Sequence, residues 1–169
     1  MSIAFRNARR EDAAALDQLF DSVFCGTFGH LYGAEDLETF LASYGVGDWE
    51  KDIADPECAF RVAEADGRLA GYVKLAPVTI PVETARPALL LEQLYVANEH
   101  HGAGIAPALM DWAFDEARRR GAEELYLTVF TDNPRARRFY ERRGFEAVGR
   151  YDFMVGNQAD EDIIMRKAL

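Results

Sequence analysis

The apolar residues of the first third of the chain follow two different periods. Residues 3–5 alternate with polar neighbours, as in a short strand, whereas residues 13–24 carry apolar side chains at intervals of three and four, as in an amphipathic helix. A second helical pattern covers residues 35–45, with acids in its first turn and a glycine at its end. Residues 46–57 are predicted to form a loop, with a short helix around Trp49 as the alternative.

In the middle of the chain the period changes to two. Residues 60–65 and 68–78 flank Asp66-Gly67, a pair that favours a two-residue turn, so they are predicted to form a hairpin. Residues 88–97 form the longest near-continuous apolar run, which is typical of a central strand covered on both faces. The remaining pattern predicts a glycine-containing loop and helix over residues 98–121, a buried strand over 124–130, a helix over 131–144 and a closing hairpin over 145–156 and 160–168.

The order of these elements is β-α-α-β-β-β-α-β-α-β-β, which predicts an α/β fold. It implies a mixed central sheet of about seven strands flanked by about four helices. No repeat, low-complexity tract or linker interrupts the order. A chain of 169 residues has the usual size of one domain, so residues 1–169 are predicted to form a single domain.

The charge balance limits the classes of partner. The chain has 19 lysines and arginines against 29 aspartates and glutamates, a formal net charge of -10. A field of that sign repels nucleic acid and anionic membranes, so neither is expected as a partner. An anionic ligand needs a basic or dipolar site of its own in such a protein, whereas a small cation is attracted to it.

Cysteine and histidine positions predict neither a disulfide nor a metal site. Cys25 and Cys58 are far apart and form no Cys-x-x-Cys motif, as expected of free thiols in a reducing compartment. His30, His100 and His101 have no metal-ligand spacing with a cysteine or a carboxylate cluster. The first segment has no apolar leader, and no later run reaches the length of a membrane span, so we expect a cytoplasmic protein.

A glycine-containing turn is the first feature that indicates a ligand. Gly102 and Gly104 lie between the apolar strand and the following helix. Unpaired N–H groups and about half a positive charge gather at a helix start, which suits a phosphate or pyrophosphate. The alternative is that the glycines only make the turn. No Gly-Lys-Ser/Thr follows, which excludes a P-loop, and Pro107 stands where a dinucleotide fingerprint has its third glycine.

Two motifs together resemble the signature half of the GCN5-related N-acetyltransferase (GNAT) family. The family's pyrophosphate loop reads Gln/Arg-x-x-Gly-x-Gly/Ala, and residues 101–106 occupy those six positions. His101 departs from the pattern, because a histidine donates a hydrogen bond without supplying a fixed positive charge. The second motif, Asn-x-x-Ala-x-x-Phe-Tyr-x-x-x-Gly-Phe, is matched throughout by Asn133, Ala136, Phe139, Tyr140, Gly144 and Phe145.

The resemblance implies that acetyl-CoA is the co-substrate. The strand end would offer backbone groups to pantetheine and to the thioester oxygen, and the helix after residue 133 carries five arginines that form a local basic surface. Arg142 is the preferred phosphate contact among Arg135, Arg137, Arg138, Arg142 and Arg143. The residues assigned to the cofactor are Leu94, Tyr95, Val96, His101, Gly102, Ala103, Gly104, Ile105, Ala106, Asn133, Tyr140 and Arg142.

Two residues are the catalytic candidates. Tyr140 matches the family's proton donor to the departing thiolate; the alternative is that it only packs beside Phe139. Glu92 lies on the apolar strand, where family members often carry a catalytic glutamate, and strand alternation places it on the side of Leu94 and Val96. The alternatives are that a neighbour satisfies this carboxylate and that ordered water serves as the base. Asn133 is expected both to cap its helix and to contact the cofactor.

The two ends of the chain resemble a subgroup, the PaiA-type spermidine/spermine acetyltransferases. Thr27-Phe28, residues 34–37 and the closing residues 151–169 have similar patterns there. This resemblance implies a polyamine acceptor. The acceptor-site candidates are His30, Tyr32 and Glu35, although the loop residues can simply be exposed and acids at a helix start stabilise the helix dipole without a ligand.

We therefore predict an N-acetyltransferase that passes the acetyl group of acetyl-CoA directly to a primary amine, a small amine or polyamine, in a ternary complex. No residue in the motifs is placed as a covalent nucleophile, since Cys25 and Cys58 lie outside them. The alternatives are a protein or peptide N-acetyltransferase and a non-catalytic acetyl-CoA-binding module. A homodimer is left open, because no sequence feature defines an interface.

Overall fold

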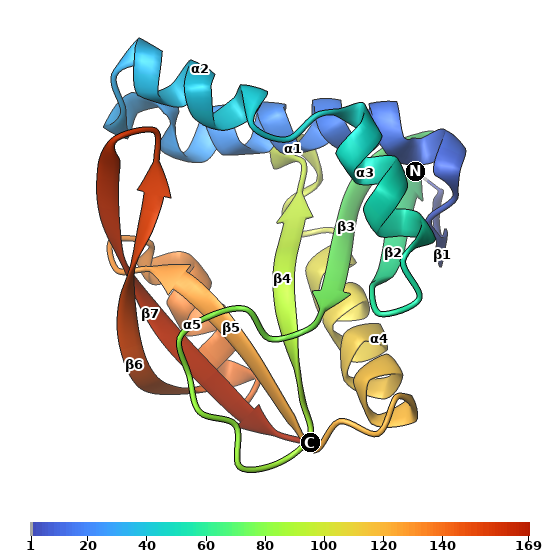
Figure 1. The fold of residues 1–169 in the computed structure, drawn as a ribbon. Helices are drawn as coiled ribbons and strands as arrows, with labels where there is room; N and C mark the ends of the chain where they lie inside the picture. The colour runs from blue at the N-terminus through green and yellow to red at the C-terminus, as the bar shows by residue number, and fades with distance from the viewer. Residues whose placement is uncertain (1) are drawn as a thin grey trace.

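The protein is built on one mixed sheet of seven strands in the order β1-β2-β3-β4-β5-β7-β6 (Figure 1). The computed structural model describes residues 2–169. Neighbouring strands are antiparallel except β4 and β5, which are parallel. The strands are β1 (Ile3–Asn7), β2 (Ala59–Ala65), β3 (Arg68–Ala76), β4 (Ala88–Val96), β5 (Glu124–Phe130), β6 (Glu146–Val155) and β7 (Gln158–Ala168).

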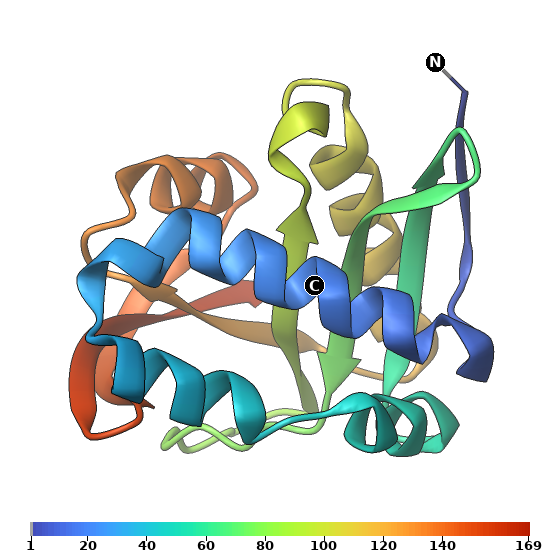
Figure 2. The ribbon, with the colours of Figure 1, turned by 90° about the horizontal axis from the view of Figure 1, so that it is seen from above.

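Five α-helices cover the two faces of the sheet (Figure 2). The cores show the layering: one apolar cluster joins α4 and α5 to the sheet, and a second joins α1, α2 and α3 to the opposite face. The predicted α/β fold with a mixed sheet of seven strands is confirmed, and the element order differs from the prediction by one added helix, α3, which makes five helices where about four were expected. The helices are α1 (Ala13–Phe28), α2 (Ala34–Ala42), α3 (Val46–Ala54), α4 (Ile105–Arg119) and α5 (Pro134–Arg142).

Helix α3 is the short helix that was the alternative to a loop around Trp49. The Asp48 carboxylate accepts the N–H of Gly45 at 2.8 Å, which caps the first turn. Trp49 is 1% exposed and packs between the rings of Phe60 and Tyr72. The burial of this indole therefore stabilises a helix of only nine residues, which is too short to be stable by itself.

The sheet opens between β4 and β5. The two strands pair only where residues 88–90 face residues 124–126, and beyond this point they diverge (Figure 1). On its other edge β4 pairs with β3, and there the register shifts: Gln93 faces Lys74, whereas Leu91 faces Leu75. Glu92 is therefore the extra residue of a β-bulge, which bends the strand beside the opening.

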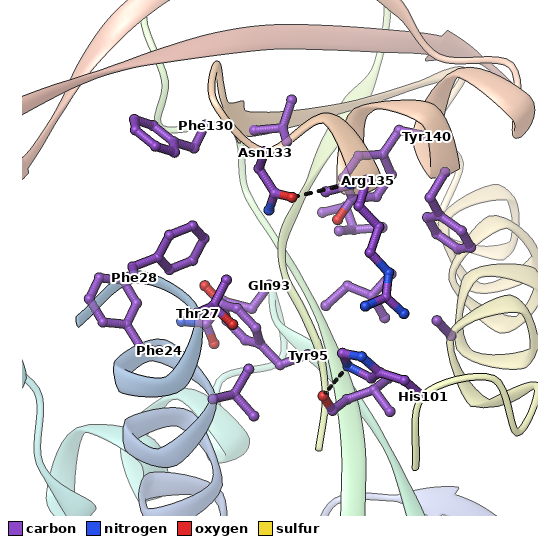
Figure 3. A pocket seen from close by; sticks show the side chains of 18 of the residues that line it. Phe24, Thr27, Phe28, Gln93, Tyr95, His101, Phe130, Asn133, Arg135 and Tyr140 are labelled. Carbon is purple, nitrogen blue, oxygen red and sulfur yellow. Dashed lines mark hydrogen bonds between the residues drawn. The ribbon is translucent and has the colours of Figure 1, made fainter. Parts of the chain in front are cut away.

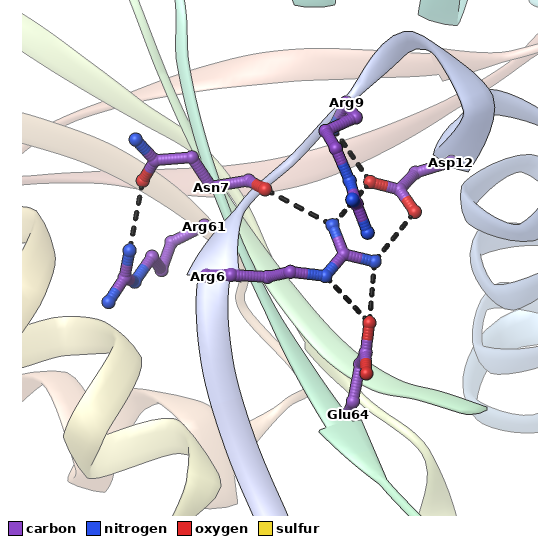
Figure 4. A network of polar contacts seen from close by, with 6 residues as sticks. All are labelled: Arg6, Asn7, Arg9, Asp12, Arg61 and Glu64. Atoms are coloured by element: carbon purple, nitrogen blue, oxygen red, sulfur yellow. Dashed lines mark hydrogen bonds and ion pairs between the residues drawn. The ribbon is translucent and has the colours of Figure 1, made fainter. Parts of the chain in front are cut away.

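An ion-pair network fixes the first strand to the first helix (Figure 4). The Arg6 guanidinium donates to both Asp12 carboxylate oxygens, at 2.7 and 2.9 Å, and to Glu64 of β2 at 2.6 Å. Asp12 also accepts the N–H of Arg9 at 2.7 Å. These hydrogen bonds, with Arg6 first, hold the pKa of Asp12 below its usual value, although partial burial opposes them.

Replacement of Asp12 by asparagine is expected to lower the free energy of unfolding by about 2 kcal/mol at neutral pH, because a charge-assisted pair is lost. A carboxyl with a lowered pKa stabilises the fold above its unfolded value of about 4, and this stabilisation disappears as the pH falls through its folded pKa. Urea unfolding of both proteins over pH 2 to 7 tests this expectation. Glu11→Gln, an exposed acid of the same turn, is the control, and a deficit that kept its full size at the acid end would contradict the account.

Candidate functional site

A cavity of about 710 Å³ occupies the opening between β4 and β5 (Figure 3). Its walls come from α1, β4, the loop before α4, β5, α5 and the β6–β7 hairpin. Because the two strands diverge here, the cavity reaches from the face covered by α4 and α5 to the face covered by α1 and α2. The opening in the sheet thus connects two chemically different walls.

The glycine loop forms one end of the cavity. Gly102 and Gly104 each have a φ of 83°, a left-handed conformation that favours glycine, and no atom lies within 4 Å of the place where a Cβ would be. Gly104 is the N-cap of α4. Within residues 2–169, the N–H groups of Gly102, Gly104, Ile105 and Ala106 have no backbone acceptor in this loop. Free donors and the helix dipole make this end suitable for a pyrophosphate.

The loop residues are not all at the surface of the cavity. Residues 101, 102 and 104–106 line it, whereas Ala103 does not. His101, the departure from the family motif, turns back on the strand, and its Nε2 lies 2.9 Å from the Val96 carbonyl oxygen (Figure 3). The imidazole with its proton on Nε2 donates to this carbonyl and so ties the loop to the end of β4.

Helix α5 contributes a polar and aromatic wall on the cofactor side. The Asn133 side chain caps the helix by accepting the N–H of Ala136 at 3.3 Å, as expected, and it also lines the cavity. Tyr140 lines the cavity while its ring packs against Phe139 and Phe145, with centroids 5.5 and 5.8 Å away. Burial raises the pKa of Tyr140 to about 12, so the phenol keeps its proton at neutral pH.

Two arginines of α5 line the cavity, Arg135 and Arg142. The sequence favoured Arg142, but Figure 3 shows Arg135 extending from the first turn of α5 toward the glycine loop and His101. The position of Arg135 in the sequence could have indicated this contact. Arg135 lies in the first turn of α5, next to the N-cap Asn133, and this end of the helix faces the glycine loop.

Strand β4 places its residues on both faces. Leu94 and Val96 pack in the cluster with α4, and Tyr95 packs in the cluster with α1, edge-on to Phe20 at 5.5 Å. The expectation that Glu92 shares the face of Leu94 and Val96 is wrong, because the bulge interrupts the alternation. Its carboxylate instead lies on the α3 face.

Glu92 is part of an ion-pair cluster around a buried lysine. Lys74 of β3 has a side chain only 5% exposed, and its Nζ lies 2.9 Å from Glu92 and 2.8 Å from Asp52 of α3. The ammonium also lies over the ring of Tyr44, 5.7 Å from its centroid. Glu92 does line the cavity, but Lys74 already lies beside it. This agrees with the alternative that a neighbouring side chain satisfies the carboxylate.

The opposite wall is aromatic and acidic. The aromatic residues of this wall are Phe24, Phe28, Tyr32, Phe40 and Phe153. Two aspartates of β7, Asp160 and Asp162, lie among them, each 7% exposed.

Of the three acceptor-site candidates, Tyr32 lines this wall and donates a hydrogen bond to Asp160. His30 and Glu35 are exposed and are not among the residues that line the cavity. Asp160 and Asp162 were missed. The signal that could have found them is the alternation of residues 160, 162 and 164, which puts two acids on the same strand face as a buried isoleucine.

The comparison with known families decides the classification. A model of the acetyltransferase (GNAT) family matches residues 18–145, which is more than half of the chain. The chain belongs to this family. The expected glycine loop, the Asn133 cap and the opening between β4 and β5 all lie within the matched region.

Individual relatives agree with the family assignment. An uncharacterized N-acetyltransferase of Lactobacillus delbrueckii subsp. lactis is 29% identical over 148 residues, 86% of each chain. Streptothricin acetyltransferase of Streptomyces lavendulae is 35% identical over 161 residues, 86% of this chain and 82% of that protein. Among solved structures, the PaiA N-acetyltransferase of Thermoplasma acidophilum in complex with coenzyme A has a TM-score of 0.80 at 24% identity over the whole of both chains, a likeness of fold.

Membership of the family makes the protein an acetyl-CoA-dependent N-acetyltransferase. The free N–H groups of the glycine loop and the two arginines fit the anionic part of this co-substrate. Over residues 2–169, no helix is both long and apolar enough to cross a membrane. The same part of the chain has no group of three or more potential metal-ligating side chains.

Proposed function

We propose that the protein transfers the acetyl group of acetyl-CoA directly to a small primary amine, with polyamines among the candidate acceptors. One observation carries this proposal: a single cavity joins the glycine loop and Tyr140 to a wall with two buried carboxylates. A cationic amine fits an acidic wall lined by aromatic rings. Both substrates can therefore lie in the cavity together, as direct transfer requires.

The residues of the chain have separate tasks in this proposal. The co-substrate supplies the thioester, and the loop N–H groups and Arg135 or Arg142 hold its phosphates. Tyr140 holds the proton that the departing thiolate needs. Cys25 and Cys58 are not in the lining of the cavity, in keeping with transfer that forms no enzyme thioester. Glu92 stays a prediction as the general base, because its carboxylate is already paired with Lys74.

The acceptor wall favours a small molecule over a peptide. The segment between α1 and α2 meets the β6–β7 hairpin across this end of the cavity. Gln158 Nε2 donates to the Leu31 carbonyl at 3.3 Å, and the Asn157 N–H donates to Asp36 at 3.0 Å. Together with the hydrogen bond from Tyr32 to Asp160, these contacts join the two segments between which an extended peptide would have to pass, which supports a small acceptor.

Thiol release from acetyl-CoA across a panel of acceptors tests the proposal. The panel holds monoamines, diamines, polyamines, amino acids and peptides with free N-termini. We expect turnover with at least one of the small amines and little or none with the peptides. Peptides as the best acceptors would contradict the proposal. Thermal stabilisation by CoA without release for any acceptor would instead indicate a binding module.

A further inference from the structure

Asp162 is a buried carboxylate without a cationic partner. It lies on β7, is 7% exposed and lines the cavity. No lysine, arginine or histidine of the described chain, residues 2–169, forms an ion pair with it, whereas Glu161, the next residue of the strand, pairs with Arg150 outside the cavity. Buried carboxylates are normally paired with a cation, so this one is an exception that needs a reason.

The groups that face Asp162 from the surrounding strands and loops are hydroxyls and a second acid. Thr128 of β5 lies near it and lowers the pKa of its carboxyl, and Asp160 precedes it by two residues on the same strand face. Tyr32, Tyr95 and Tyr151 approach from the α1–α2 connection, β4 and β6. Burial is the main cause that raises the pKa of these three phenols, and the negative charge of Asp162 raises it further. None of these groups supplies a positive charge.

The two aspartates differ in how far their oxygens are satisfied. Asp160 accepts hydrogen bonds from the Tyr32 hydroxyl and, at 3.4 Å, from Gln158. Asp162 accepts none of the side-chain hydrogen bonds found among residues 2–169, and Thr128 is the one donor that acts on its pKa. A carboxylate accepts about four hydrogen bonds, so Asp162 keeps most of its capacity free toward the cavity. Burial, with Asp160 beside it, raises the pKa of Asp162 to about 6, the direction expected of a charge without a partner.

We propose that Asp162 binds the ammonium group of the acceptor and that Asp160 beside it excludes acceptors with a carboxylate next to the amine. The inference rests on the proposed function and narrows its substrate class to amines such as those left when an amino acid loses its carboxyl group. The acceptor enters as an ammonium, which supplies up to three donors to Asp162, and the rings of Phe24, Phe28 and Phe40 cover its carbon chain. The bound ammonium then passes one proton to solvent, and the neutral amine that remains attacks the thioester carbon while the thiolate leaves and takes the proton of Tyr140. A carboxylate on the neighbouring carbon would face two buried acids.

Matched acceptor pairs test the substrate class. The pairs are 2-phenylethylamine with phenylalanine, putrescine with ornithine, and cadaverine with lysine. For each pair that reacts, we expect kcat/KM to be at least about ten-fold higher for the amine without the carboxylate. Equal or higher kcat/KM for the amino acids would overturn the proposed role of Asp160. No thiol release by the wild type with any acceptor would overturn the proposed function itself and this inference with it.

Asp162→Asn tests the binding residue. We expect kcat/KM for the amine to fall at least about thirty-fold, chiefly through a higher amine KM, while the KM for acetyl-CoA stays unchanged. Glu161→Gln is the matched control, because it removes the same charge from the same strand at a side chain that is 51% exposed. An unchanged amine KM in Asp162→Asn, or an equal loss in Glu161→Gln, would overturn the inference.

A stability measurement separates ligand binding from a structural role. Without substrates, Asp162→Asn is expected to keep or raise the Tm at pH 8, since it removes a buried charge that has no partner. A carboxyl with a raised pKa costs stability above that pKa, so the gain should disappear below about pH 4. A Tm several degrees below that of the wild type at pH 8 would assign Asp162 to the fold and overturn the inference.

Discussion

Tyr140→Phe is expected to reduce kcat by about a hundred-fold or more while the Kd for acetyl-CoA stays within about two-fold of the wild type. The substitution removes only a hydroxyl, and the ring still packs against Phe139 and Phe145. A thiolate expelled without a positioned acid takes its proton from water, which slows the chemical step. Binding is unaffected in this account because the loop and the arginines hold the anionic part of the co-substrate.

Single-turnover kinetics measure the rate of the chemical step, and calorimetric titration with CoA measures the affinity for the co-substrate. Tyr126→Phe is the control for loss of a phenol, since Tyr126 is buried in a separate apolar cluster and does not line the cavity. Because burial raises the pKa of Tyr140 to about 12, its ionisation should produce no alkaline loss of rate below pH 10. Full turnover in Tyr140→Phe would show that water or another residue protonates the thiolate.

Lys74→Met is expected to lower the free energy of unfolding by about 2 kcal/mol, equivalent to a Tm about 4 to 8 °C lower, because the lysine is buried while its two carboxylates are partly exposed. The methionine keeps the volume of the side chain but leaves Asp52 and Glu92 facing each other without their cation. Burial by itself would lower the pKa of Lys74, but the two carboxylates outweigh it and raise the pKa. The ammonium is therefore charged at every pH at which the enzyme is handled.

Thermal and urea unfolding test the Lys74 expectation. Lys51→Met, at an exposed position of the same helix as Asp52, is the control for the loss of one positive charge. Adding Asp52→Asn and Glu92→Gln to Lys74→Met should recover part of the loss, because the stranded charges are then removed. A deficit below about 1 kcal/mol for Lys74→Met would show that solvent screens this cluster as it does a surface pair.

Residues with a local conformational requirement could be predicted from the sequence. Gly102 and Gly104 have positive φ because the turn before α4 needs it, and Asp66-Gly67 forms the predicted tight turn with φ of 52° and 82°. Asn133 caps α5 through a hydrogen bond three residues along the chain. In each case the determining contacts lie within a few residues, so the sequence pattern contains them.

Residues whose role depends on distant strands were harder to predict. The predicted face of Glu92 was wrong because one extra residue in β4 shifts the alternation of its side chains. That bulge arises from the pairing of β4 with β3. Asp160 and Asp162 reach the cavity because β7 lies between β5 and β6, an order that no local pattern indicates. Glu35 carries the acid pattern of a helix start and is exposed, which agrees with the dipole interpretation rather than a ligand site.

The division of the cavity between different parts of the chain has a consequence for changing its selectivity. The wall with the glycine loop and Tyr140 comes from one continuous stretch, residues 91–142, whereas the acidic and aromatic wall comes from residues 20–40 and 153–162. Libraries confined to these two outer segments would therefore vary the acceptor while leaving the donor apparatus intact. The enzyme is in this respect modular, and an exchange of its ends is a route to new amine selectivity.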